Sequence, residues 1–125
     1  MIQFSIAVHN LGPSNADEDS IIIADSLPPE ARLMFATGSM NPIVFINGPT
    51  ASGLSYNFVA LGDSGDDIEF SNDGGATRIV PLVDPITGLD LTVPRINHLR
   101  INPKGTLVPS PTGPSFTLRL LMKID

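Results

Sequence analysis

Apolar side chains recur at every second position in two stretches, one at each end of the chain. The alternation covers residues 2–8 and residues 116–124. A period of two places successive side chains on opposite faces of a β-strand, so each stretch has one buried face and one solvated face. Both stretches therefore predict amphipathic strands. The second is the more regular, and it predicts a centrally paired strand with Leu118 and Leu120 in the core.

Glycine and proline interrupt the chain at short intervals. There are 11 glycines and 12 prolines among 125 residues, and they break every stretch long enough for an amphipathic helix. Short strands separated by such turns are typical of all-β sandwiches and barrels. Hydrophobic residues make up 42% of the chain, which argues against disorder. We expect a single domain, over residues 1–125, with one core.

The positions of the strands follow from the short apolar runs between these turns. The expected strands cover residues 2–8, 20–25, 33–35, 43–46, 54–61, 68–70, 77–80, 96–101 and 116–124. The run 54–61 is apolar on both faces, which predicts a strand covered on both sides. A turn over Ser71–Ala76 predicts a hairpin between 68–70 and 77–80. The expected core consists of Ile6, Val8, Ile23, Leu27, Phe35, Phe58, Phe70, Leu99, Ile101, Leu118 and Leu120.

The first third of the chain contains an ordered set of turn and strand residues. Asn10, Gly12, Pro13 and Ser14 are followed by Asp25, Leu27, Pro28 and Phe35. This order resembles the N-x-G-P-S … D-x-L-P … F pattern of the DUF11 repeat family, whose members are immunoglobulin-like modules of large bacterial and archaeal surface proteins. Residues 70–75, 98–105 and 114–119 are similar to a bacterial subgroup of these modules. The resemblance therefore covers most of the chain.

The resemblance implies an immunoglobulin-like Greek-key β-sandwich of about seven strands. It also implies a non-catalytic structural or spacer module of a bacterial cell-surface or secreted protein, cut from a larger chain. The expected location is extracellular, and the expected partners are neighbouring modules of the same parent protein. Modules of this kind usually carry an extra strand upstream, so an edge strand is expected to be missing or to come from a neighbour.

A second interpretation is a binding module for adhesion to proteins or glycans. Such a module would act through its end loops or by adding a strand at a sheet edge. Glycan binding is disfavoured by the aromatic content, which includes one Tyr and no Trp. Residues 1–90 carry twelve acids and two bases, a net charge of -10, which disfavours nucleic acid and anionic membranes. No apolar run approaches the roughly 20 residues that span a bilayer, so membrane insertion is not expected.

Few residues suggest chemistry. The chain has two histidines, His9 and His98, no cysteine and no G-x-S-x-G motif, so neither nucleophilic catalysis nor a zinc site is expected. A crosslink between a lysine and an asparagine would have to use Lys104 or Lys123, and Lys123 is expected on the outer face. We expect no enzymatic activity and no cofactor.

Calcium is the one metal for which the sequence offers ligands. Asp63, Asp66, Asp67 and Asp73 lie on turns, and calcium takes six to eight oxygen ligands from flexible loops. The spacing is not that of an EF-hand. Aspartates on such turns also accept hydrogen bonds from nearby backbone amides, which is the alternative reading. Asp66 and Asp67 are expected to be exposed.

Overall fold

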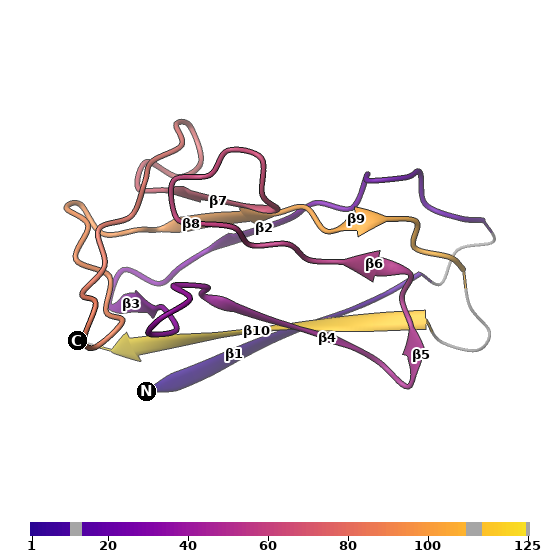
Figure 1. Cartoon of the computed structure of the whole chain (residues 1–125), viewed down its shortest axis with the longest axis horizontal. Coiled ribbons are helices and arrows are strands. Elements are labelled where there is room, and N and C mark those ends of the chain that lie inside the picture. Colours follow the sequence, from indigo (N-terminus) through magenta and orange to yellow (C-terminus); the bar gives the residue numbers. More distant parts are fainter. Residues whose placement is uncertain (11–13, 110–113, 125) are drawn as a thin grey trace.

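The computed structural model describes residues 1–10, 14–109 and 114–124. In these residues the chain forms ten β-strands and no helix, and seven of the strands span four residues or more. The strands form two facing layers (Figure 1). The prediction of an all-β fold with a sandwich-like arrangement is therefore confirmed. No helix that could cross a membrane occurs in the described ranges.

The first layer is organised around β10 (Pro114–Ile124), the longest strand. Along one edge it pairs antiparallel with β1 (Ile2–His9) through eight consecutive residue pairs. Along the other edge it pairs antiparallel with β3 (Ala31–Met34) and β4 (Ile43–Asn47), and parallel with β5 (Thr50–Ala51). The predicted central position of this strand is confirmed.

The second layer contains the remaining five strands. Strands β2 (Ile23–Ser26), β8 (His98–Ile101) and β7 (Ile68–Ser71) form an antiparallel sheet in that spatial order. Next to them, β6 (Leu54–Ser55) pairs with β9 (Lys104–Gly105). In Figure 1 these strands lie above β10 and are spread along its length.

The hydrophobic core lies between the two layers. Of the expected core residues, Leu27, Phe35, Phe70, Leu99, Ile101, Leu118 and Leu120 are buried. Ile6, Val8, Ile23 and Phe58 are partly buried and pack against them. The Phe116 and Phe45 rings stack with their centres 5.1 Å apart. Alternation along the terminal strands thus identified the side chains that face the core.

The prediction of a long strand over residues 54–61 is wrong beyond Ser55. Only Leu54–Ser55 forms a strand, and the chain then continues without ladder pairing. The physical reason is that aspartate side chains take the backbone donors: Asn57 donates to Asp67 and Val59 donates to Asp66. Coverage on both sides is also wrong, because Val59 is exposed.

The hairpin predicted after β7 is reduced to a single bridge. The Ile79 amide donates to the Phe70 carbonyl at 2.9 Å, and no further pair joins the two segments. Pro81 follows two residues later and has no amide hydrogen for a ladder. The outer edge of β7 is therefore largely free of strand pairing in the described residues.

Truncation of Leu118 tests the central role of β10. Leu118 is fully buried, so Leu118→Ala should lower the free energy of unfolding by about 2–5 kcal/mol through lost burial and a residual cavity. The measurement is chemical denaturation followed by circular dichroism. The control is Arg119→Ala at the exposed neighbouring position, which should change stability by less than about 0.5 kcal/mol. Equal losses in both variants would contradict the assignment.

Candidate functional site

Three aspartates are buried in the described part of the chain. They are Asp66, Asp67 and Asp90. The prediction that Asp66 and Asp67 are exposed is wrong, because their carboxylates turn inward to meet the backbone of residues 57–59. A buried carboxylate needs partners to offset its loss of hydration. The hydrogen-bond partners of each carboxylate therefore identify the segment that it holds in place.

Asp67 joins three separate segments. Its Oδ2 accepts the Asn57 amide at 2.7 Å, and its own amide donates to the Asn57 carbonyl at 2.9 Å. Its Oδ1 lies 3.3 Å from the ammonium of Lys104 on β9. Its carbonyl accepts the Asn102 amide. Asp67 is thus a structural junction between the irregular segment after β6 and the turn before β9.

The side chain of Lys104 is held in this junction by polar contacts. Its ammonium donates to the carbonyl and to the side-chain oxygen of Asn102 and forms the ion pair with Asp67. Lys123, the other lysine, is exposed on the outer face of β10 as predicted.

Tyr56 lies close to the same acids. Its hydroxyl donates to the Asn41 side-chain oxygen at 2.9 Å. Burial raises the pKa of Tyr56 well above its usual value, and the negative charges of Asp66 and Asp67 raise it further. The phenol is therefore protonated at neutral pH. Its hydroxyl is a hydrogen-bond donor to Asn41.

Asp90 is fully buried and was not identified from the sequence. Its Oδ1 accepts the Thr92 amide at 2.9 Å, and its Oδ2 accepts the Ile96 amide at 3.0 Å. Its own amide donates to the Leu33 carbonyl, and its carbonyl accepts the Arg32 guanidinium. It connects the segment before β8 to β3. The sequence contains no signal for this role, since Asp90 lies between the strands expected over residues 77–80 and 96–101.

The four calcium candidates lie on two turns, one before and one after β7, and their carboxylates have different hydrogen-bond partners. Asp63 accepts the Gly65 amide at 2.7 Å, which is the local turn interaction considered as the alternative. Asp73 accepts from Ser71 and Thr77, while Asp66 and Asp67 are engaged by other backbone segments. Across residues 1–10, 14–109 and 114–124, no group of three or more acidic, His or Cys side chains is placed to hold a metal ion.

One serine, one histidine and one aspartate do lie close together. Ser71 on β7 is directly opposite His98 on β8, and the Ser71 hydroxyl donates to Asp73 at 2.6 Å. The same hydroxyl oxygen accepts the amides of Asp73 and Gly75. In a catalytic triad the histidine lies between the serine and the carboxylate; here the serine proton goes to the carboxylate directly.

The space beside this group is small. The adjoining cavity, lined by Ser71, Gly75 and His98 among others, has a volume of about 30 Å³. That volume corresponds to about one water molecule. The group is therefore a turn held by hydrogen bonds. Sequence reasoning missed it because only the register of β7 on β8 brings Ser71 and His98 together.

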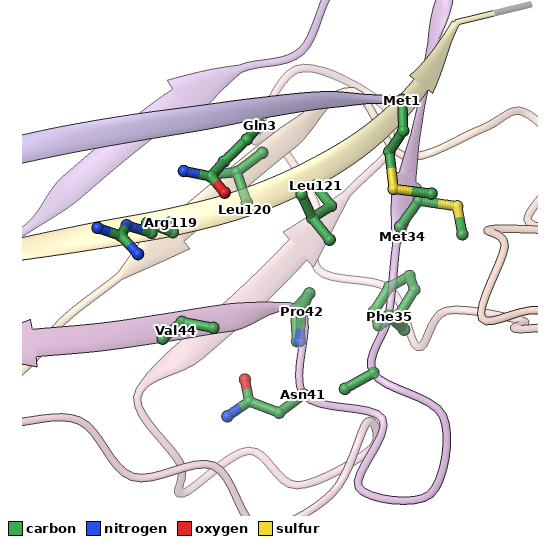
Figure 2. Close-up of a pocket in the computed structure, with 11 residues that line it drawn as sticks. Met1, Gln3, Met34, Phe35, Asn41, Pro42, Val44, Arg119, Leu120 and Leu121 are labelled. Atoms are coloured by element: carbon green, nitrogen blue, oxygen red, sulfur yellow. The ribbon is translucent and has the colours of Figure 1, made fainter.

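A larger depression lies on the outer face of the first layer, where β3 and β4 leave β10 partly uncovered. Its volume is about 270 Å³. Figure 2 shows Met1, Met34, Val44 and Leu121 around it, with Gln3 and Arg119 to one side. The lining is mostly apolar and holds no carboxylate, histidine or hydroxyl group. It can accept an apolar group.

Comparisons with known proteins do not assign the chain. No family model, no curated protein and no solved structure matches it. The resemblance to DUF11 modules stays a prediction, and the function must be inferred from the geometry.

Removal of the Asp90 carboxylate should destabilise the fold. Asp90→Ala leaves the Thr92 and Ile96 amides without acceptors, and we expect a loss of about 2–6 kcal/mol at about 1–3 kcal/mol for each amide. Denaturant titration measures it. Asp90→Asn, which keeps one acceptor oxygen, should lose less, and Glu30→Ala at an exposed position should be near neutral. A neutral Asp90→Ala variant would contradict the role.

The Asp73 turn predicts an unusually acidic carboxyl group. Hydrogen bonds from the side chain of Ser71 and from Thr77 lower the pKa of Asp73 from 3.8 to about 2. The stabilisation from this carboxylate is therefore complete above pH 3.8 and is lost as the pH falls toward 2. Carboxyl NMR shifts during acid titration measure the midpoint. Ser71→Ala should move it up toward 3.8; an unchanged midpoint would contradict the assignment.

Proposed function

We propose that the chain is a non-catalytic structural module that spaces or displays other parts of a bacterial cell-surface or secreted protein. Its strands would form an immunoglobulin-like Greek-key sandwich. The observation that supports this most directly is the hydrogen bonding of the buried aspartates. Asp66, Asp67 and Asp90 all accept backbone amides of irregular segments. The interior polar groups thus hold loops in place and are not available to a substrate.

The positions of the chain ends support display. Ile2 pairs with Met122, so the start of β1 and the end of β10 lie together at one end of the sandwich (Figure 1). Covalent neighbours on both sides would leave from that end. The opposite end, which includes β5 and residues 47–50, would then face away from the attachment.

A second candidate function is binding of a protein or glycan partner. It is favoured by exposed apolar side chains in the segment between β7 and β8, where Ile86 is 85% and Val93 is 90% exposed. Apolar groups on loops at one end of a sandwich are suited to contact with another protein. Glycan recognition has less support, since Phe4 is the only exposed large aromatic residue in the described chain. Saturable binding on a glycan array or to a purified surface protein would favour this candidate.

Thermal melting tests the structural proposal and the calcium alternative together. A ligand that binds only the folded form raises the melting midpoint. We expect the same midpoint in excess calcium and in excess chelator, because the carboxylates of Asp63, Asp66, Asp67 and Asp73 each accept a different backbone amide. Asp17→Asn, at an exposed site, is the control. A calcium-dependent rise that disappears in Asp66→Asn or Asp73→Asn would overturn the expectation.

A further inference from the structure

Strand β1 has one edge without a partner. It pairs only with β10 among the described strands, and its other edge faces outward. Protein edges of this kind usually carry a charged residue, a proline or a bulge, which prevents pairing with other chains. The eight residues of β1, IQFSIAVH, contain no Asp, Glu, Lys, Arg, Gly or Pro, and their pairing with β10 is uninterrupted.

The direction of the backbone groups on β1 follows from the pairing of β10. The Gly48 amide donates to the Ser115 carbonyl, so the backbone of Ser115 faces β4. Backbone groups alternate between the two edges along a strand. The even-numbered residues of β10 therefore face β1 and bond the even-numbered residues opposite them. It follows that Gln3, Ser5, Ala7 and His9 present their amides and carbonyls to the free edge.

The same strand has a core-facing side that is only half covered. Ile2 and Phe4 are 46% and 43% exposed, although their partners across the ladder, Met122 and Leu120, are buried. Ile22, just before β2 in the facing layer, is 49% exposed. The second layer therefore does not extend over the first half of β1. An unpaired edge and an uncovered apolar face occur on one strand.

We propose that a second copy of this chain covers β1, with the two β1 strands antiparallel about a two-fold axis at Ser5. Each Ser5 lies opposite the other, Gln3 lies opposite Ala7, and Phe4 lies opposite Ile6 of the other copy. All outward-facing backbone groups from Gln3 to Ala7 are then paired, and the two first layers form one continuous sheet.

A copy of the chain is favoured as the occupant because β1 is complementary to itself. Antiparallel self-pairing brings no like charges together, since the strand has no Asp, Glu, Lys or Arg. In the register centred on Ser5, core-facing Ile2 and Phe4 meet core-facing Val8 and Ile6. A shift by one residue would set core-facing side chains against outer ones. Ile2 and Phe4, which are half exposed in a single sandwich, are thereby placed beside Val8 and Ile6 of the other copy.

The inference names a partner for edge-strand addition and so rests on the second candidate function. The structural proposal does not depend on it. A chain that proves monomeric would overturn the dimer and leave the melting experiment with calcium unaffected. A dimer whose melting midpoint rises in calcium would support this inference and would contradict the expected result of the melting experiment.

Sedimentation velocity over a range of concentrations tests the association. We expect a monomer–dimer equilibrium for the chain. Ser5→Lys should shift it to monomer, because two ammonium groups would lie opposite each other at the axis; Ser5 is exposed in the single chain, so the fold tolerates the change. Ser26→Lys makes the same charge change on β2, the edge of the other sheet, and should leave the equilibrium unchanged. Circular dichroism confirms that both variants are folded.

Amide hydrogen exchange identifies the edge. The amides of Gln3, Ser5 and Ala7 should exchange quickly in dilute solution and become protected as the concentration rises. Those of Phe4 and Ile6, bonded to β10, should be protected throughout. A monomer at every concentration, a Ser5→Lys variant that still dimerises, or dimerisation without protection of the Gln3, Ser5 and Ala7 amides would each overturn the proposal.

Discussion

The pairing of β10 along both of its edges is the constraint on which the rest of the structure depends. One edge is used in full by β1, and the other is divided among β3, β4 and β5. A strand in this position has almost no free backbone donors, and its inner side chains, from Phe116 to Met122, are buried. The facing layer needs only to cover that row of side chains. The facing strands span only two to four residues, and their buried side chains pack in one core with those of β10.

The second organising element is a set of carboxylates that replace strand pairing. Between β6 and β7 the chain makes no ladder, yet the amides of Asn57 and Val59 are bonded, because Asp67 and Asp66 accept them. An amide buried without an acceptor costs about 1–3 kcal/mol, so these side chains make an irregular segment tolerable beside the core. Asp90 does the same for the segment before β8. In this fold, acidic residues near the core hold loops.

Sequence reasoning succeeded where one strand face decides the outcome and failed where a distant partner decides it. Alternation located β1, β10 and the buried side chains of Leu118 and Leu120, since a period of two follows from strand geometry alone. It could not show that Asp66 and Asp67 turn inward, because their acceptor role depends on a segment seven to ten residues away in the sequence. The pairing of Ser71 with His98 was also hidden, since it follows from a register between separate strands. Alternation also gives the face of a side chain without saying whether anything covers that face, as Phe4 shows.

The unpaired edge of β1 and the exposure of its core-facing side chains have a common geometric origin. The first layer has β1 as its outer strand, whereas the facing layer ends at β2, where Ile22 is already half exposed. A sheet that extends past its covering layer leaves both an edge and part of an inner face in water. A strand added beside β1 would complete the backbone pairing of that edge and would bring apolar side chains next to Ile2 and Phe4. β1 and β10 are antiparallel, and the start of β1 lies beside the end of β10. A strand added antiparallel to β1 would therefore begin at the opposite end of the sandwich. In the proposed dimer, the edge of β1 would therefore set both how two copies associate and how they are oriented relative to each other.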